Sequence, residues 1–226
     1  MTVLCRMRLS RAPTAQALKA LLDPPEAGAR MDAQHRLLWS AFGDRPDRAR
    51  DFLFRDMGHG DFAVLASRPP QATELFEPPE VTPFAPDLRA GDRLSFVLRA
   101  NATRSLPSGP GRRGVRVDVV MERLHGVSEA ERADRRMDIA QEAGADWLAR
   151  QGARAGFAPV RTDVASYDAV TLPGHRGRRK GAPRLGLLEM TGVLEVTDPA
   201  AFVPAVVAGF GRAKAFGNGL MLLRRA

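Results

Sequence analysis

The side chains best suited to proton transfer in this 226-residue chain are its four histidines: His35, His59, His125 and His175. An imidazole exchanges protons near neutral pH because its unperturbed pKa is about 6.5. These histidines share no metal-ligand spacing with one another or with the single cysteine, Cys5, and the acidic residues form no paired-carboxylate motif of the two-metal nuclease type. We therefore expect no metal site.

A glycine-rich, basic stretch lies close to the end of the chain, GFGRAKAFGNGLMLL at 209–223. Its glycines miss the G-x-G-x-x-G spacing and no G-x-x-x-x-G-K-[ST] motif occurs, so we expect no nucleotide cofactor and no other cofactor. Glycine lacks Cβ, so such a loop lets backbone amides approach a phosphate chain, and nearby cations add charge. A plain helix-to-strand connection with a glycine C-cap explains the glycines equally well. The candidate RNA-binding residues of this loop are Gly209, Gly211, Arg212 and Lys214.

The chain carries a formal net charge of +8 and a pI near 10.9, which favours polyanionic partners, nucleic acid before anionic lipid. Two stretches, 99–117 and 174–184, each hold five basic residues and no acidic one, whereas a solvated surface usually mixes both signs. For 174–184 the alternative is a solvated surface turn. The residues that we expect to contact a nucleic acid in these stretches are Arg99, Asn101, Arg104, Arg112, Arg113, Arg176, Arg178 and Arg179.

The first part of the chain predicts a shortened version of a β-α-β-β-α-β module. Apolar alternation indicates strands over 2–9, 51–57 and 61–67, and period 3.6 indicates a helix over 29–42. Residues 10–30 read as a helix-bearing insertion, and the proline-rich 77–92 as a linker with an edge strand.

The second part predicts the full order β-α-β-β-α-β, so we expect an α+β protein of two tandem ferredoxin-like domains, at 1–86 and 87–226. A capping box of Ser128 and Glu131 opens the clearest helix, whose apolar face we expect to include Ala133, Met137, Ala140 and Trp147. The other expected elements are strands at 94–101, 157–173, 184–196 and 220–225 and a helix from Asp198 to Gly209, and 99–117 is expected to be a loop beyond the first of these strands.

The helical pattern by itself favours a structural role for His35. On a helix it shares one face with Met31, Leu38, Trp39 and Phe42, which is typical of a core or boundary histidine.

The chain shows no apolar run near the ~20 residues of a membrane span, and its N-terminus has no export signal. We expect a cytoplasmic protein with no membrane partner. Cys5 lies in an alternating apolar segment, as a buried thiol does.

Four segments together resemble the CasE family of CRISPR repeat endoribonucleases, the RNA-processing subunit of the type I-E Cascade complex. They are DAQHRLLWSAF, DRPDRARDFLFR, FVLRANATR and GFGRAKAFGNGLMLL, and the resemblance covers essentially the whole chain in the same order. It implies two tandem ferredoxin-like domains of the RNA-recognition-motif kind. It also implies antiviral-defence activity: cleavage of the repeat stem-loop in precursor crRNA without a metal, giving 5′-hydroxyl and 2′,3′-cyclic phosphate ends. The implied partners are the repeat RNA hairpin, which stays bound after cleavage, and other Cascade subunits.

The resemblance places the catalytic histidine of the family on His35. Characterised members tend to have a tyrosine three residues earlier, where this chain has Asp32, and the only tyrosine here is Tyr167. Asp32 either holds the imidazole and favours its protonated form, or caps the helix. We expect Lys180 to stabilise charge at the scissile phosphate. A non-catalytic RNA-hairpin-binding subunit of a ribonucleoprotein complex is the alternative, and a protein-interaction subunit that meets guide RNA only after assembly is a second one.

Overall fold

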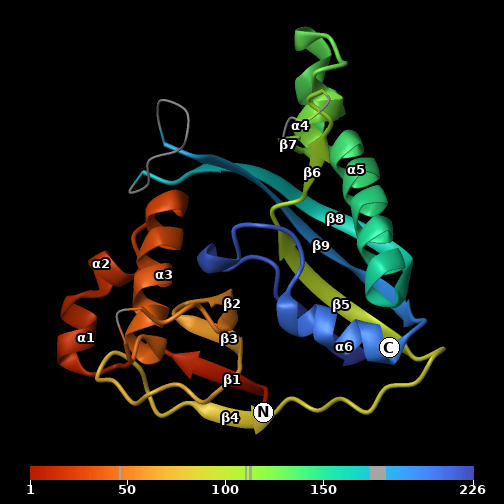
Figure 1. Ribbon diagram of the computed structural model, residues 1–226. Coiled ribbons are helices and arrows are strands. Elements are labelled where there is room, and N and C mark those ends of the chain that lie inside the picture. The colour runs from red at the N-terminus through yellow and green to blue at the C-terminus, as the bar shows by residue number, and fades with distance from the viewer. Residues whose placement is uncertain (46, 110, 112–113, 174–181) are drawn as a thin grey trace. The chain divides into compact units, whose positions relative to one another are not determined.

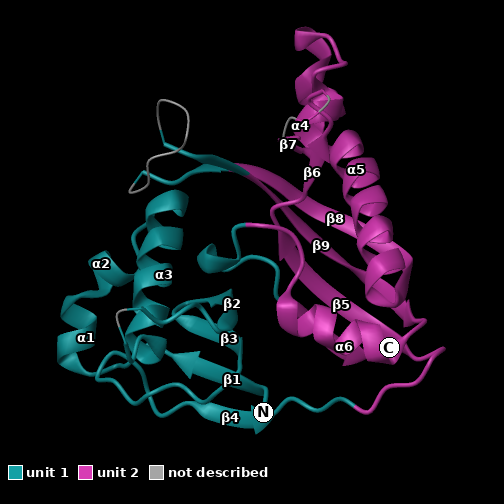
Figure 2. Ribbon diagram, viewed as in Figure 1, with its two compact units in different colours: residues 1–86, 170–185, 213–220 teal, residues 87–169, 186–212, 221–226 magenta. Residues whose placement is uncertain are grey.

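The chain folds into two compact units, each assembled from three separate segments (Figures 1 and 2). The computed structural model describes residues 1–226 except 46, 110, 112–113 and 174–181. Unit 1 contains Met1–Pro86, Val170–Leu185 and Ala213–Leu220, and unit 2 contains Asp87–Ala169, Gly186–Arg212 and Met221–Ala226.

Unit 1 is an antiparallel four-stranded sheet in the order β2-β3-β1-β4. This is the ferredoxin-like strand order in shortened form, because residues 67–79 connect β3 to β4 without the second helix. The early segment expected to bear a helix contains two short ones. The elements are β1 (Val3–Arg8), α1 (Pro13–Ala17), α2 (Lys19–Leu22), α3 (Ala27–Phe42), β2 (Phe52–Gly58), β3 (Asp61–Ala66) and β4 (Glu80–Pro83).

The core of unit 1 fixes the position of α3. Leu38 and Phe42 of this helix are fully buried in one cluster with the sheet, and the Phe42 and Phe52 rings stack with centroids 4.5 Å apart. Cys5 belongs to the same cluster, and burial raises the pKa of its thiol to about 11. The predicted buried thiol is therefore confirmed.

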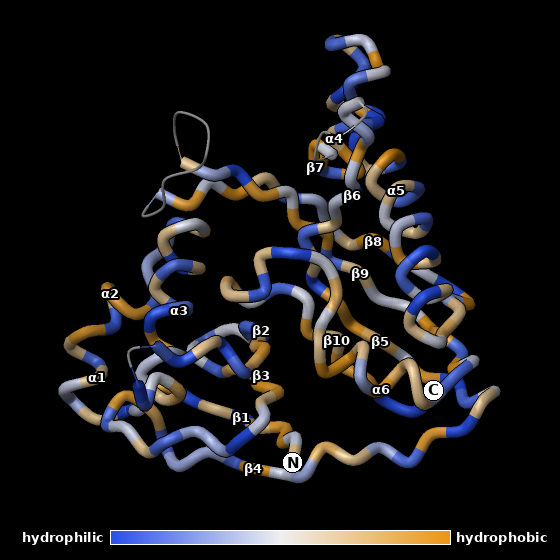
Figure 3. Tube along the Cα trace, in the orientation of Figure 1, coloured by the Kyte–Doolittle hydropathy of each residue, from blue (hydrophilic) through white to orange (hydrophobic). Residues whose placement is uncertain are grey.

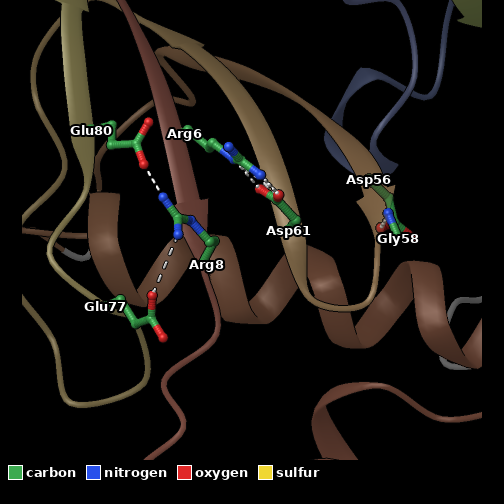
Figure 4. A network of polar contacts seen from close by, with 7 residues as sticks. All are labelled: Arg6, Arg8, Asp56, Gly58, Asp61, Glu77 and Glu80. Atoms are coloured by element: carbon green, nitrogen blue, oxygen red, sulfur yellow. Dashed lines mark hydrogen bonds and ion pairs between the residues drawn. The ribbon is translucent and has the colours of Figure 1, made fainter.

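The opposite face of β1 carries ion pairs (Figure 4). Arg6 meets Asp61 at 2.5 Å, while Arg8 pairs with Glu80 and lies 4.0 Å from Glu77. Exposed pairs of this kind contribute little to stability, but each acid offsets the charge of its arginine. The positive potential of the protein therefore depends on other arginines.

Unit 2 repeats the same antiparallel topology in full, with the order β10-β5-β9-β8, so two tandem ferredoxin-like units are confirmed. Leu94, Phe96 and Leu98 of β5 are buried as the alternation predicts. The elements are β5 (Arg93–Ala100), β6 (Thr103–Leu106), β7 (Val115–Asp118), α4 (Val119–Leu124), α5 (Arg132–Ala155), β8 (Phe157–Thr171), β9 (Arg184–Val196), α6 (Pro199–Ala208) and β10 (Met221–Arg225).

Three local features of unit 2 differ from the sequence prediction. The stretch expected to be a loop contains the β6–β7 ribbon, and a further helix, α4, follows it. Ser128 bonds the Glu131 side chain ahead of a 3₁₀ turn, so α5 begins only at Arg132. Ala133 and Met137 are exposed because the first turns of α5 precede its buried stretch, which begins at Ile139.

The remaining helix predictions hold. Asp198 caps α6 by accepting from the amides of Ala200 and Ala201 at 3.0 and 3.2 Å. Figure 3 shows hydrophilic and hydrophobic positions alternating along α5, as an amphipathic helix requires. Among the described residues, no helix combines the length and apolarity needed to cross a bilayer.

Candidate active site

Helix α3 presents His35 from a well-capped position in unit 1. The Glu26 carboxylate caps the helix by accepting from the amides of Gly28 at 2.9 Å and Ala29 at 2.5 Å, and these bonds lower the pKa of Glu26. Asp32 is therefore not the cap, so the capping alternative for this residue is wrong. It lies one turn further into the helix, where its largely buried carboxylate pairs with the exposed Arg36 at 2.5 Å.

The His35 ring lies against the glycine-rich loop, 180 residues further along the chain. Its Nδ1 is 2.8 Å from the Ala215 carbonyl oxygen, which can only accept, so Nδ1 carries the proton. Trp39 and Phe216 flank the ring, with centroids 6.3 and 5.2 Å away. The ring is half-buried rather than sealed in the core.

The backbone of the loop is shaped to present that carbonyl. Residues Lys214–Phe216 form one 3₁₀ turn, η2, between Ala213 and Gly217, which both have left-handed φ, +53° and +75°. A Cβ at Gly217 would lie 2.9 Å from the Phe54 ring, so the turn and the sheet need a glycine there. The fully buried Asn218 amide donates to the carbonyls of Ala213 at 3.2 Å and Phe216 at 3.0 Å, which closes the turn.

Two cations of unit 1 accompany the loop. Lys214 immediately precedes the residue that holds His35, and its pKa is lowered first by burial and then by the charge of Arg50. Burial likewise lowers the pKa of Arg50, whose guanidinium donates to the Phe52 carbonyl. Two like charges in a desolvated setting favour an anion between or beside them. Arg50 was missed by sequence reasoning, although it stands inside the matched DRPDRARDFLFR segment.

The α3 helix also packs closely on the base of the basic 174–184 stretch. A Cβ on Gly28 would lie 1.8 Å from the Thr171 carbonyl oxygen, so only glycine permits this approach. Leu172 and Pro183 are joined across the base by a backbone hydrogen bond of 3.0 Å. Several predicted site residues lie outside the described residues: Arg112, Arg113, Arg176, Arg178, Arg179 and Lys180.

The other predicted RNA contacts belong to unit 2 and differ in availability. Asn101 is 5 % exposed and its amide donates to the Gly186 carbonyl at 2.8 Å, so the expectation that its side chain is accessible is wrong. The alternation of β5 ends at Ala100, and Asn101 has turned inward. Arg104 is exposed but paired with Glu122, Arg99 is half-buried, and Arg212 is exposed.

The remaining glycines of the loop have backbone roles. Gly209 ends α6 with φ +75°, as the C-cap alternative expects. Gly211 has φ +76°, and a Cβ there would lie 2.8 Å from the Asn101 carbonyl oxygen. The Arg212 amide bonds that same carbonyl at 3.1 Å.

Tyr167 and His125 belong to unit 2. The buried Tyr167 donates its hydroxyl to Asp118 at 2.9 Å in unit 2, and His125 is exposed at the end of α4. Across the described part of the chain, no cluster of three or more His, Cys, Asp or Glu side chains has metal-binding geometry.

The arrangement suits acid–base chemistry on a polyanion. With Nδ1 protonated against Ala215, the lone pair of the neutral ring is on Nε2, which can accept a proton and return it. Nearby cations can stabilise negative charge. The fold and this cluster define a tandem ferredoxin-like protein with a histidine fixed by a glycine-rich loop.

Comparison with known proteins gives the same architecture. A family model described as CRISPR associated protein matches residues 4–225. The CRISPR system Cascade subunit CasE of Escherichia coli K12 is 29 % identical over 194 residues, which are 84 % of this chain and 89 % of that protein. The chain belongs to this CRISPR associated family, and the predicted resemblance to CasE proteins is confirmed.

Solved structures share the fold across nearly the whole chain. A CRISPR endoribonuclease Cse3 bound to a 19-nucleotide RNA has a TM-score of 0.67 at 22 % identity, covering 99 % of this chain and 100 % of its own. The CRISPR-associated protein Cas6e from Escherichia coli K-12 has a TM-score of 0.61 at 21 % identity, with coverages of 99 % and 100 %.

Proposed function

We propose that this chain is a metal-independent endoribonuclease that binds the CRISPR repeat stem-loop of precursor crRNA and cleaves at the base of its stem. It leaves 5′-hydroxyl and 2′,3′-cyclic phosphate ends and remains on the product as a subunit of Cascade, in the cytoplasm. The family and the RNA-bound Cse3 structure support this function. The observation that carries it is the 2.8 Å contact that fixes His35 against the glycine-rich loop.

In this reaction the ribose 2′-hydroxyl attacks the adjacent phosphorus and loses its proton, and the 5′-oxygen of the next nucleotide leaves and gains a proton. The protein must align the hydroxyl with the phosphorus, transfer the protons and stabilise the charge on the phosphorane. Nε2 of His35 is the nitrogen that transfers a proton in this reaction, since Nδ1 is held by Ala215. The backbone carbonyl and the flanking rings keep the imidazole in one orientation.

Charge on the phosphorane is stabilised by cations from two segments of unit 1. Lys214 and Arg50 accompany the His35 loop, and desolvation strengthens their attraction for an anion. Lys180, in the stretch whose base packs on α3, joins them in this proposal. Asp32 acts through its helix, since its carboxylate pairs with Arg36, one turn along the side of α3.

The alternative is a non-catalytic subunit that binds the RNA hairpin. It is favoured by one observation, the presence of Asp32 where characterised family members tend to have tyrosine. Such a protein would bind the hairpin tightly and never cut it. A protein-interaction subunit that meets RNA only after assembly would instead bind the isolated hairpin weakly.

One experiment separates these functions. The purified chain is incubated with end-labelled repeat RNA in excess chelator, beside the same RNA carrying a 2′-deoxy nucleotide at the cut site. We expect cleavage of the first RNA to a 2′,3′-cyclic phosphate and tight binding without cleavage of the second, which lacks the nucleophile. Binding of both RNAs with no cleavage at high protein concentration would establish the alternative.

A further inference from the structure

Unit 2 contains a pocket that the proposed cleavage chemistry does not use. It is lined by the β6–β7 ribbon and the last turns of α5, and four of its lining residues are arginines: Arg104, Arg116, Arg150 and Arg154. We propose that this arginine pocket binds phosphate groups of the RNA backbone, as a second anchoring site for the transcript. That the bound polyanion is RNA rests on the proposed function.

The charges in the arginine pocket are poorly compensated. Arg104 is paired with Glu122 at the rim. Within the described chain, Arg116, Arg150 and Arg154 have no ion-pair partner, whereas other arginines of unit 2, such as Arg123 beside Asp146, do. All three side chains are exposed. Such a concentration of one sign attracts an anion from solution.

The spacing in α5 adds to this argument. Arg150 and Arg154 are four residues apart, so they lie on one helix face, where like charges repel. A cation in the last helical turn is favourable, which accounts for Arg154 alone. It does not account for Arg150 or for Arg116 on the facing ribbon. A bound phosphate would offset the repulsion among all three.

The chemistry of the lining favours a phosphodiester over an acidic protein segment. The planar guanidinium fork matches phosphate geometry, and Thr103, Ser105 and Gln151 contribute further hydrogen-bonding groups to the pocket. Apart from Trp147, which is only 2 % exposed, the pocket has no large apolar wall on which a protein side chain would anchor, as far as the described residues line it. Phosphate contacts of this kind position a nucleic acid without reading its sequence.

The same residues connect the pocket with the glycine-rich segment of unit 2. Trp147 lines the pocket, and a Cβ on Gly211 would lie 3.4 Å from its ring. Thr103 follows two residues after Asn101, whose carbonyl bonds the Arg212 amide. The exposed Arg212 and the arginine pocket are therefore held by one framework.

The test measures binding separately from cleavage. The triple variant R116Q/R150Q/R154Q is compared with wild type on a repeat hairpin with single-stranded flanks and a 2′-deoxy nucleotide at the cut site. The matched control is R93Q/R135Q/R161Q, which removes three exposed arginines of unit 2 that each have an acidic partner. Thermal unfolding of both variants checks that the fold is intact.

We expect Kd for the pocket variant to rise tenfold or more, and the slope of log Kd against log salt to fall by about 0.7–0.9 for each phosphate that the variant no longer neutralises. The control should change Kd by less than about threefold. The weakening should be equal on a hairpin with a permuted loop sequence. Cleavage by wild type of the unmodified hairpin tests the proposed function independently: binding without cleavage refutes the nuclease but leaves the pocket supported.

Two outcomes would overturn the proposal. One is a pocket variant that binds RNA with the affinity and salt slope of the control, which would assign the pocket to an acidic protein partner. The other is a wild-type chain that binds no RNA hairpin at all. RNA would then not be the ligand of the pocket, and the proposed function would be wrong as well.

Discussion

At the scale of single residues, the proton of His35 is fixed by a backbone carbonyl rather than by a carboxylate. A carbonyl cannot donate, so this contact places a proton on Nδ1. Nε2 is then the nitrogen to which the proposed function assigns proton transfer.

Replacing His35 by Ala should lower the cleavage rate by about 100-fold or more, because proton transfer by a positioned imidazole contributes about 10²–10⁴-fold. Hairpin affinity should stay nearly unchanged, since cations supply most of the binding. Single-turnover cleavage and filter binding measure the two effects. His125→Ala, which changes an exposed histidine of unit 2, is the control. An equal decrease in rate and affinity would make His35 a structural residue.

Lys214→Gln should weaken hairpin binding without lowering stability at pH 7. Burial and Arg50 lower the pKa of Lys214, so its charged form is disfavoured in the folded protein. That penalty is fully present below the folded pKa and disappears as pH rises to the unfolded value of about 10.5. Unfolding temperatures at pH 7 and pH 10 check this: any advantage of the variant should shrink at the higher pH. A variant less stable than wild type at pH 7 would show that Lys214 serves the fold.

Residue roles were only partly predictable from the sequence. Pattern alone made His35 a boundary histidine, which its half-buried position matches, and only the family resemblance pointed to chemistry. In the sequence, Asn101 continues the alternating pattern of the preceding strand, but β5 ends one residue earlier, at Ala100. Arg50 carries no local motif, because its importance depends on a loop far along the chain.

At the scale of elements, α3 contacts two other segments of unit 1 through residues two turns apart, the base of the basic stretch at Gly28 and the glycine-rich loop at His35. The strands and long helices were predictable because each buries one face with a regular period. The β6–β7 ribbon and α4 were missed because two strands of four residues and a helix of six are too short to show a clear period.

Gly28→Ala tests the approach of α3 to Thr171. Alanine favours a helix by up to about 1 kcal/mol over glycine, but a Cβ only 1.8 Å from a backbone oxygen forces the helix to move. Overpacking of this kind costs about 1–3 kcal/mol, so the unfolding temperature should fall by several degrees. Gly126→Ala, whose Cβ would meet its nearest atom at 3.4 Å, is the tolerant control. If both variants melt alike, α3 does not require this contact.

At the scale of the whole molecule, the net charge of +8 favours a polyanionic partner, and the 174–184 stretch contributes five of the basic residues. Neutralising Arg176, Arg178 and Arg179 together should weaken hairpin binding and reduce its salt slope by about 0.7–0.9 for each phosphate released from a guanidinium. Fluorescence anisotropy across a salt series measures both. The R93Q/R135Q/R161Q variant removes the same charge from paired sites and should retain the wild-type slope. An unchanged slope in the first variant would make the 174–184 stretch a solvated turn.

The division of the chain into domains at residue 86 stays a prediction. Unit 1 is completed by a late segment of the chain, Ala213–Leu220, and this has a consequence for how the protein is synthesised. A ribosome completes α3 long before it adds Ala215, so the nascent imidazole has no carbonyl to set its tautomer. A chain truncated before Ala213 would keep His35 and lose the carbonyl that holds its ring. The proposed cleavage therefore becomes possible only after the ribosome has added the glycine-rich loop.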